Sequence, residues 1–454
     1  MSKNSINRRE FLSSAAVVGA AGTLGAGALL SSCGGTAKEP ALIPLRPEAE
    51  WNIPKLQAGG ILPDKAKDGA PLKAGVIGCG GRGTGAAQDF LNSAPNVSIV
   101  ALGDVFADQV KNCQNALKNQ KIPDNMCFSG FDNYEKVIAA GVDVVIIATP
   151  PGFRPLHFKA AVDAGKHVFL EKPLSVDPVG ARSIITTSKK AESQGLCVVT
   201  GTQRHHQRVY IEGYKQVQSG LIGDIVGGQV YWNGSIPWWK TKQAGWTDME
   251  WMVRDWVNWT WLSGDHIVEQ HVHNIDVFNW FSGLKPVRCV GFGARHHRPT
   301  GDQFDMFSID YIYEGGIHVH SMCRQMYGCA NNVSERIQGT KGVWKSDGVI
   351  TDLKGNELWK YDGEKEKEEF QQNNPYVLEH VNLVNHIRDK KPICQAEETA
   401  VSTLTAIMGR ISSYTGREVT WDEMMASDMN LVPDKPELKN MDMKQYPIPV
   451  PGRA

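Results

Sequence analysis

Residues 74–85 read AGVIGCGGRGTG, and this stretch decides the fold of the first part of the chain. An apolar run enters a G-x-G-x-x-G pattern made by Gly78, Gly80 and Gly83. In a strand-turn-helix unit the first glycine permits the tight turn, the second lets the backbone approach a pyrophosphate, and the third lets the helix pack on the strand. The pattern therefore predicts a dinucleotide-binding loop, with contacts expected from Gly78, Gly80, Gly81, Arg82 and Gly83.

A carboxylate follows the loop at the spacing that this type of site requires. A second apolar run, residues 97–102, leads to Asp104, about 20 residues after the last glycine. At the end of the second strand a carboxylate accepts a hydrogen bond from the ribose 2′-hydroxyl and repels a 2′-phosphate. Asp104 therefore predicts NAD as the cofactor, with NADP as the less favoured alternative.

The N-terminus has the features of an export signal. Arg8 and Arg9 precede Phe-Leu and an Ala/Gly-rich apolar run, which resembles a twin-arginine signal, and Leu-Ser-Ser-Cys, ending at Cys33, resembles a lipobox. We expect residues 1–33 to direct export and Cys33 to be lipidated, which predicts a periplasmic lipoprotein anchored to the membrane only through its lipid. A membrane-spanning helix is the alternative, but glycine and alanine dominate the run.

The composition argues against several classes of partner and site. With 48 basic and 49 acidic side chains the formal net charge is −1, and no long basic run occurs, so neither nucleic acid nor an anionic membrane surface is expected as a partner. The nine cysteines show no C-x-x-C pair and no zinc-site spacing. Although an exported protein can form disulfides, Cys79 and Cys197 look like small buried side chains, and we expect few or no bridges.

Changes of pattern along the chain predict its domain organisation. From residue 72, apolar strands alternate with helices, as in a doubly wound α/β sheet. Beyond residue 200, strand-like runs follow a helical region, which predicts an α+β domain with a mostly antiparallel sheet. The predicted parts are an arm or tether at 34–70, a Rossmann dinucleotide-binding domain at 71–201, an α+β substrate and oligomerisation domain at 202–425, and an extended tail at 426–454.

Periodicity within these domains predicts individual elements. In the first domain we expect strands at 72–77, 97–102, 143–149, 167–170 and 196–200, and helices at 84–92, 156–164 and 178–193. In the second we expect helices at 209–219, 268–281, 376–388 and 399–416, and strands at 225–232, 287–293, 304–313, 316–323 and 334–338.

Two further motifs stand at the ends of predicted strands. One strand ends in A-T-P-P, with Thr149, Pro150 and a downstream His157, and the next is followed by Glu171 and Lys172 in an E-K-P motif. Open α/β sheets bind ligands at the carboxyl ends of their strands, so these side chains are expected at the cofactor. With the glycine loop, the motifs resemble the glucose-fructose oxidoreductase and inositol dehydrogenase family, called Gfo/Idh/MocA, over residues 72–420.

The resemblance implies a Rossmann domain, a second domain with an open antiparallel sheet, and a lysine that touches both the nicotinamide region and the reacting hydroxyl. That lysine is Lys172. An ammonium group at this place can stabilise the alkoxide that develops during hydride loss, or it can relay the hydroxyl proton. Outside such a motif, a surface lysine paired with Glu171 would be the ordinary interpretation.

A second cluster of ionisable residues follows in the predicted second domain. On one helix Glu269, His273 and Asp276 share a face because they are spaced by four and three residues. The resemblance implies a D-x-x-x-H-x-x-D motif here, with Glu269 in place of the first aspartate, and implies that His273 exchanges the hydroxyl proton. We expect Glu269 and His273 to be catalytic, together with the lysine of the E-K-P motif, and Asp276 to contact the substrate. His266 and His271 leave a metal site as an alternative, but none is expected, since the family works without a metal.

Other substrate contacts are expected beyond the last Rossmann strand. Gln203 and Arg204 stand where they can contact cofactor or substrate hydroxyls, or can join the two domains by hydrogen bonds. Eight of the 13 tryptophans lie between residues 232 and 261. Most are expected in the core or in the subunit interface of a homo-oligomer, but Trp238 and Trp239 occupy an irregular segment and suit stacking on a sugar face.

These features favour an NAD-dependent oxidoreductase that acts on a secondary hydroxyl of a sugar or glycoside. Free NAD is a cytoplasmic pool, but the twin-arginine route carries folded proteins, so we expect the cofactor to stay bound and to be recycled on the enzyme. The alternative is an NAD-dependent glycosidase that transiently oxidises C3, eliminates the aglycone and returns the hydride. A third hypothesis, a silent sugar-binding lipoprotein, is disfavoured by Lys172 and His273.

Overall fold

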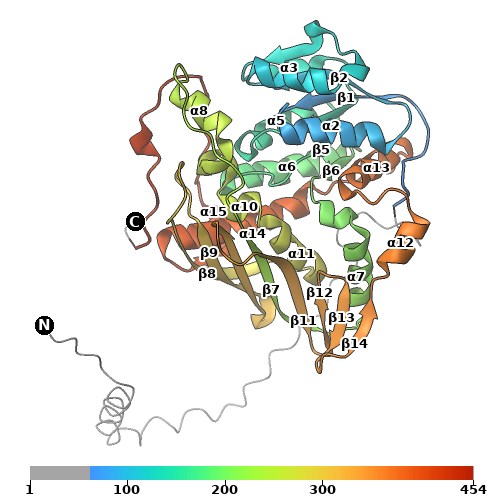
Figure 1. Cartoon of the computed structure of the whole chain (residues 1–454), viewed down its shortest axis with the longest axis vertical. Coiled ribbons are helices and arrows are strands. Elements are labelled where there is room, and N and C mark those ends of the chain that lie inside the picture. Colours follow the sequence, from blue (N-terminus) through green and yellow to red (C-terminus); the bar gives the residue numbers. More distant parts are fainter. Residues whose placement is uncertain (1–61, 453–454) are drawn as a thin grey trace, which may run out of the picture. The chain divides into compact units, whose positions relative to one another are not determined.

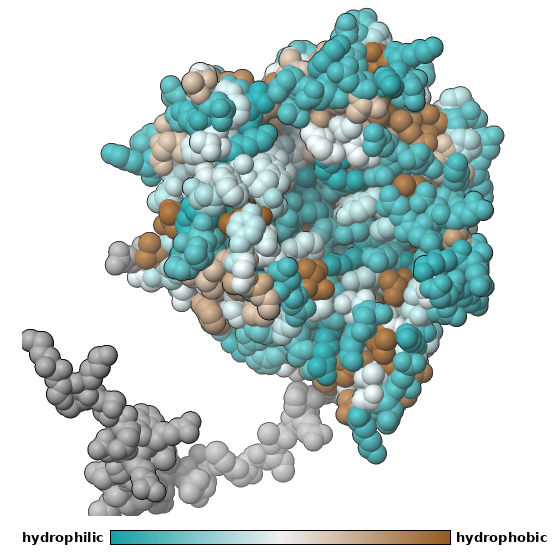
Figure 2. Space-filling model, in the orientation of Figure 1, coloured by the Kyte–Doolittle hydropathy of each residue, from teal (hydrophilic) through white to brown (hydrophobic). Residues whose placement is uncertain are grey.

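The computed structural model describes residues 62–452, which build two β-sheets with helices packed against them (Figure 1). The first sheet has six strands in the order β3-β2-β1-β4-β5-β6, and the second has nine in the order β14-β13-β12-β11-β7-β10-β9-β8-β15. This arrangement confirms the predicted fold class, a Rossmann domain followed by an α+β domain with a mostly antiparallel sheet. The face shown in Figure 2 is mostly hydrophilic, with hydrophobic residues scattered over it.

All strands of the first sheet run parallel. They are β1 (Leu72–Ile77), β2 (Val97–Asp104), β3 (Cys127–Ser129), β4 (Val144–Ile147), β5 (His167–Leu170) and β6 (Val198–Thr200). The chain order reverses at β1, between β2 and β4. At such a switch point the carboxyl ends of neighbouring strands leave a crevice in which open α/β sheets bind ligands.

Five helices from the same part of the chain accompany this sheet, namely α2 (Gly81–Ser93), α3 (Ala107–Ala116), α4 (Asn133–Ala139), α5 (Arg154–Asp163) and α6 (Pro178–Ser193). The start of α6 follows from local chemistry, because the Asp177 side chain accepts a hydrogen bond from the Gly180 N–H at 2.7 Å and Pro178 fits the first helical position. A distant helix, α13 (Pro375–Arg388), also packs here, against α2. Its Val377, Val381 and Val384 lie in the core of this sheet, although the sequence placed the segment in the second domain.

The second sheet is antiparallel except where β7 runs parallel to β10. Its strands are β7 (Ile225–Gly234), β8 (Pro286–Ala294), β9 (Met306–Tyr313), β10 (His318–Gln325), β11 (Asn332–Gly339), β12 (Gly342–Lys345), β13 (Val349–Asp352), β14 (Glu357–Lys360) and β15 (Val419–Thr420). Residues of β10 alternate between buried and more exposed positions, so one face of this strand packs on the core.

The remaining helices are α7 (Arg208–Gln218), α8 (Asp248–Arg254), α9 (Thr260–Ser263), α10 (His266–Glu269), α11 (Val272–Ser282), α12 (Gly363–Glu369), α14 (Ala396–Thr415) and α15 (Trp421–Ala426). α11 is buried along its whole length. α14 packs against α6 on one side and against β8 on the other, so it ties the two sheets together.

The single helix predicted at 268–281 is wrong, because α10 ends at Glu269 and α11 begins at Val272. At the break the His273 N–H donates to the Gln270 carbonyl at 3.2 Å, one residue later than a continuous α-helix requires. The Glu269 carbonyl instead accepts a hydrogen bond from the Lys172 ammonium at 2.7 Å. A long-range contact therefore replaces the local helical bond that periodicity predicts.

Both ends of the chain extend beyond the two sheets in sequence. The predicted signal and its Cys33 lie outside the described residues, as does most of the predicted arm; at the end of that arm Ala66 is buried in the core of the first sheet. Of the predicted tail, residues 426–452 are described; beyond Ala426, which ends α15, they contain one 3-10 turn, Met443–Gln445, and are otherwise irregular. Within residues 62–452, no helix is long and apolar enough to cross a membrane, and the eight cysteines are free thiols.

Candidate functional site

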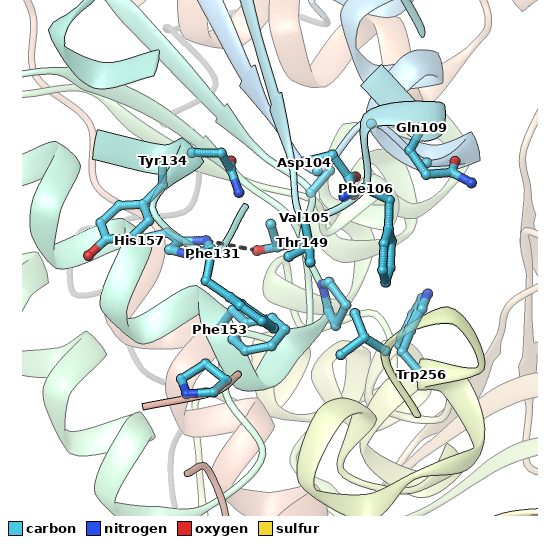
Figure 3. A pocket seen from close by; sticks show the side chains of 18 of the residues that line it. Asp104, Val105, Phe106, Gln109, Phe131, Tyr134, Thr149, Phe153, His157 and Trp256 are labelled. Carbon is cyan, nitrogen blue, oxygen red and sulfur yellow. Dashed lines mark hydrogen bonds between the residues drawn. The ribbon is translucent and has the colours of Figure 1, made fainter. Parts of the chain in front are cut away.

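A cavity of about 640 Å³ lies at the carboxyl ends of the parallel strands. Its inner wall is formed by the loops that follow β1, β2, β3 and β4, and Figure 3 shows side chains from these loops surrounding a common space. Pockets for small molecules and cofactors measure about 300–1,000 Å³. The predicted cofactor residues that line the cavity are Gly78, Gly80, Gly81, Arg82, Gly83, Asp104, Thr149, Pro150 and His157.

The loop glycines meet distinct steric demands. Gly78 has a φ of +92°, and a Cβ at Gly83 would lie 1.7 Å from the Gly78 carbonyl oxygen. A Cβ at Gly80 or Gly81 would meet no atom of the described residues within 4 Å, so both positions face open space. The first-turn N–H groups of α2 border this space and are suited to binding an anion. The loop therefore fits the pyrophosphate of a dinucleotide.

Asp104 ends β2 and lines the cavity beside the glycine loop. Its carboxylate oxygens accept one backbone hydrogen bond each, from the Cys79 N–H at 2.7 Å and from the Phe106 N–H at 3.0 Å. Burial raises the pKa of Asp104, while these two bonds favour its ionised form. A carboxylate oxygen can accept more than one hydrogen bond, so Asp104 retains the capacity to bind a ribose hydroxyl.

The residues after β4 form another part of the inner wall. Thr149 Oγ1 and His157 Nδ1 are 3.2 Å apart, and Figure 3 marks this hydrogen bond. The His157 ring stacks on Tyr134 with 4.6 Å between the ring centroids. Burial, followed by the charge of Arg154, lowers the pKa of His157 to about 3. The imidazole is therefore neutral at pH 7 and shapes the wall by packing and hydrogen bonding.

Glu171 is not among the residues that line the cavity, and its carboxylate is engaged by protein groups. It forms an ion pair with Arg82 at 2.5 Å, and the same guanidinium lies 2.9 Å from Asp89 and 3.6 Å from Glu379. Burial opposes ionisation of Glu171, but the charge of Arg82 and of other nearby cations outweighs burial and lowers its pKa. Glu171 thus anchors the E-K-P loop to the start of α2.

Arg154 joins the two motif loops, and sequence reasoning missed it. Its Nε donates to the Thr149 carbonyl at 2.8 Å and its Nη1 donates to the Pro173 carbonyl at 2.6 Å. The residue is only 4% exposed. An arginine at the start of a helix gives no distinctive signal, because only the pairing of β4 with β5 brings the A-T-P-P and E-K-P loops together.

Lys172 joins the end of β5 to α10 of the other sheet's domain. Its Nζ donates to the Glu269 carbonyl at 2.7 Å and lies 3.3 Å from Glu269 Oε1. Both side chains are 13% exposed. Two contacts to one residue fix the ammonium in place while a small part of it stays accessible. The structure thus brings together two of the three predicted catalytic residues.

His273, the third, is the second residue of α11 and follows Glu269 by four residues. Burial, then the charges of Lys172 and Arg204, hold the pKa of His273 well below its usual range. The ring stacks on Trp232 with a centroid distance of 5.8 Å. Within residues 62–452 neither ring nitrogen has a hydrogen-bond partner, so a neutral imidazole is available to accept a proton.

Asp276 shares α11 with His273, but its carboxylate is engaged by protein groups. Oδ2 lies 2.6 Å from His205 Nε2, and Oδ1 accepts a hydrogen bond from the Ser402 hydroxyl at 2.8 Å. The residue is 4% exposed. This geometry favours an internal positioning role over the predicted substrate contact.

Gln203 and Arg204 follow β6 at the junction of the two domains. Arg204 pairs with the buried Glu335 at 3.3 Å and lies 5.8 Å from the Trp232 ring centroid. Glu335 also accepts hydrogen bonds from Tyr210 and from Asn274 of α11. Arg204 is therefore held by the second sheet, beside the ring that stacks on His273.

The two tryptophans proposed as a sugar platform occupy different places. Trp238 is 37% exposed and lines the cofactor cavity, whereas Trp239 is 44% exposed and does not. The position of Trp238 favours a contact with cofactor over the predicted contact with sugar.

His266 and His271, which the sequence analysis considered as possible metal ligands, contact protein groups. His271 Nε2 lies 2.7 Å from Ser321 Oγ, and His266 Nδ1 lies 2.9 Å from Asp265. Among residues 62–452, no group of three or more metal-ligating side chains is assembled in a way that would hold an ion. The buried polar contacts of these two histidines are structural.

Comparison with known proteins agrees with this geometry. The family model described as the oxidoreductase family with an NAD-binding Rossmann fold matches residues 72–207, and the GFO/IDH/MocA C-terminal domain matches residues 213–345. A scyllo-inositol 2-dehydrogenase (NAD(+)) of Bacillus subtilis is 23% identical over 233 residues, which cover 51% of this chain and 60% of that relative. A glycosyl hydrolase family 109 protein of Streptomyces coelicolor is 26% identical over 159 residues, covering 35% of this chain and 33% of the relative.

Solved structures agree on the fold. The scyllo-inositol dehydrogenase from Lactobacillus casei, with bound NAD(H) and scyllo-inositol, superposes with a TM-score of 0.58 at 20% sequence identity. The match covers 77% of this chain and 99% of that one. The two family domains together span more than half of the chain, in the order that the two sheets follow. The chain therefore belongs to the Gfo/Idh/MocA oxidoreductase family.

Proposed function

We propose that this protein is an NAD-dependent oxidoreductase that oxidises a secondary hydroxyl of a sugar, a sugar-like polyol or a glycoside. The observation that carries the proposal is the pairing of a fixed ammonium with a neutral imidazole. Lys172 is held by Glu269 at the start of the helical region that carries His273, and burial, then the charge of Lys172, lowers the pKa of His273. Proton exchange at a hydroxyl requires a group that can accept the proton and a cation that stabilises the resulting oxyanion, here a neutral imidazole and an ammonium.

Lys172, His273 and Glu269 have different roles in the proposed oxidation. The glycine loop and Asp104 would hold NAD, which would supply the acceptor for the hydride of the carbinol carbon. His273 accepts the hydroxyl proton, for which its lowered pKa keeps it unprotonated at neutral pH. Lys172 stabilises the negative charge that develops on the carbinol oxygen, since a preoriented cation in a partly buried site acts strongly on such charge. Glu269 positions Lys172 through its carbonyl and carboxylate.

Cofactor retention is part of the proposal. The cavity that fits NAD is lined by loops of the first sheet and also by Trp238, Lys240 and Trp256 of the second domain. A cofactor enclosed from two sides exchanges slowly, so it has to be reoxidised in place by a second carbonyl substrate or acceptor. This behaviour suits an enzyme that works away from the cytoplasmic NAD pool.

A redox-neutral glycosidase remains the second candidate, and one observation favours it. The glycosyl hydrolase family 109 protein aligns with part of this chain. The same Lys172 and His273 serve both reactions, because each begins with oxidation of a carbinol.

Product analysis separates the two candidates. The protein is denatured and released nucleotide is identified by mass spectrometry; the native protein is then incubated with cyclitols, free sugars and aryl glycosides. Oxidase-type turnover yields a keto product and a reduced acceptor, whereas the glycosidase releases aglycone without net oxidation. Absence of bound or bindable NAD, or turnover that survives loss of both Lys172 and His273, would contradict the proposal.

We also propose that the protein is exported as a lipoprotein, on the strength of the twin-arginine and lipobox patterns ending at Cys33. The substitution Cys33→Ala should release the protein from membrane fractions, because the lipid is the only proposed anchor. Fractionation of cells expressing each form tests this. Membrane association of a Cys33→Ala protein with a cleaved signal would contradict the lipobox assignment.

A further inference from the structure

The cofactor cavity has an outer wall made by parts of the chain distant from the Rossmann loops. The wall consists of Trp238, Lys240, Val253, Arg254, Trp256, Asp434, Lys435 and Pro436. The last three belong to the C-terminal tail, which lies beyond residue 345, where the match to the second family domain ends. Trp256 is seen beside Phe106 in Figure 3, on the side of the cavity near Asp104.

The tail is attached on both sides of the three residues that reach the cavity. Before them, the Leu431 N–H donates to Asp177 Oδ2 at 2.8 Å. After them, the Met441 N–H donates to Asp248 Oδ2 at 3.0 Å, and the Lys439 carbonyl accepts a hydrogen bond from the Met249 N–H at 3.1 Å. The tail therefore bridges from the start of α6 to α8 and passes the cavity on the way.

An apolar cluster holds the same segment in place. Its buried members include Phe106 and Phe153 from the Rossmann loops and Met252 and Trp259 from the second domain. The tail residues packed against it are Leu431, Val432, Met441, Met443 and Tyr446. Detaching the tail exposes this apolar surface to water, which opposes opening.

Arg254 adds a polar link between α8 and the Rossmann loops. Its guanidinium lies 3.8 Å from the Phe106 ring centroid and donates to both carboxylate oxygens of Asp108, at 3.0 and 3.2 Å. Phe106 is two residues beyond Asp104, the predicted ribose ligand. The outer wall is thus fastened next to the place where the adenosine half of NAD would bind.

We infer that residues 431–441 form a strap that closes the cavity over the adenosine half of NAD, so that cofactor leaves only when the strap detaches. The inference rests on the proposed function. Trp256 and Pro436 supply apolar surface for an adenine ring, and Lys240 and Lys435 supply positive charge for an anionic nucleotide. A cofactor held by a preformed wall loses less freedom on binding, which slows dissociation.

Two variants and a control test the strap. One variant lacks residues 431–454, and the other, Leu431→Asp with Met441→Asp, keeps the full length but disrupts the apolar packing. Lys444→Ala, an exposed position in the same tail, is the matched control. The NADH dissociation rate is measured by displacement with excess NAD, following nicotinamide fluorescence, and thermal unfolding reports on folding. We expect dissociation about 10-fold faster or more in both variants, which corresponds to about 1.4 kcal/mol, and no change in the control.

A second measurement uses the full chain without substitution. Trypsin is expected to cut after Lys439 about 10-fold more slowly when NADH is bound, if the strap and cofactor stabilise each other. Equal dissociation rates in the folded variants and the control would overturn the inference, as would equal cleavage with and without NADH. Failure of the full-length protein to bind NADH would instead contradict the proposed function.

Discussion

The two walls of the cofactor cavity are built by different means. The inner wall is formed by the loops at the carboxyl ends of parallel strands, where the backbone packs so closely that a Cβ at Gly83 would run into the Gly78 carbonyl. The outer wall is made of side chains from α8, its neighbours and the tail, held by an apolar cluster and by Arg254. The difference indicates a division of labour: the inner wall recognises the nucleotide, and the outer wall controls its release.

The largest effect is expected at the junction of the two domains. Lys172→Ala or His273→Ala should lower turnover at least ~100-fold, the scale for losing a positioned acid, base or charge. Bound NAD should remain, because the glycine loop and Asp104, which line the cavity, are expected to hold its phosphates and ribose. Since the two act on one hydroxyl, the double variant should be little worse than either single variant. Full activity in either single variant would place the reaction elsewhere.

Substitutions of two glycines in the inner wall should affect NADH binding and thermal stability differently. A Cβ at Gly80 meets no described atom within 4 Å, so Gly80→Val should fold normally while its side chain occupies the space for pyrophosphate. Overpacking of about 1–3 kcal/mol corresponds to about 5- to 150-fold weaker NADH binding. Gly83→Ala should lower the melting temperature instead. Calorimetry and NADH titration test the pair, and equal effects on both properties would contradict this view of the loop.

Asp104 is the inner-wall residue expected to favour NAD over NADP. Asp104→Ala should weaken NAD binding about 10-fold, because a hydrogen bond to a charged group contributes about 1.5–3 kcal/mol. Binding of NADP should weaken less, or improve, because the carboxylate no longer repels a 2′-phosphate. Titrations with both nucleotides give the ratio, and an unchanged NAD/NADP ratio would remove Asp104 from the ribose site.

Stability is also expected to depend on pH. Burial lowers the pKa of His157, His206 and His271 to about 3 each, whereas an unfolded histidine titrates near pH ~6.5. Below that pH the unfolded chain binds the extra protons, so stability is full above pH ~6.5 and is lost as pH falls toward 3, by up to about 1.4 kcal/mol per pH unit for each histidine. Urea unfolding at pH 7 and at lower pH measures the slope, and His206→Gln should reduce it; a flat profile would contradict these pKa shifts.

The sequence predicted the inner wall better than the outer one for a physical reason. β1, β5 and α6 begin and end where predicted, because alternating apolar runs, glycine turns and the Asp177 cap are local signals. The motifs at the ends of β2 and β4 are local as well, and their Asp104 and Thr149 line the cavity.

The remainder depends on contacts between residues far apart in the chain. The Lys172 bond to the Glu269 carbonyl breaks a helix that periodicity predicts to be continuous. Arg154 gains its position from the pairing of β4 with β5, and α13 leaves its predicted domain to cover α2. The tail lacks apolar periodicity, so the sequence predicts only an extended segment. Nothing local reveals that residues 434–436 reach the cavity.

The most direct test of the account is a single-turnover experiment on protein purified with its nucleotide. The nicotinamide absorbance is followed after rapid mixing with an excess of an oxidisable cyclitol, sugar or glycoside, with no NAD added. The account predicts one equivalent of reduced nicotinamide per active site, formed by the wild type and by Lys444→Ala and lost with Lys172→Ala. Reduction that appears only when free NAD is supplied would contradict retention of the cofactor, and reduction that persists in Lys172→Ala would contradict the assigned site.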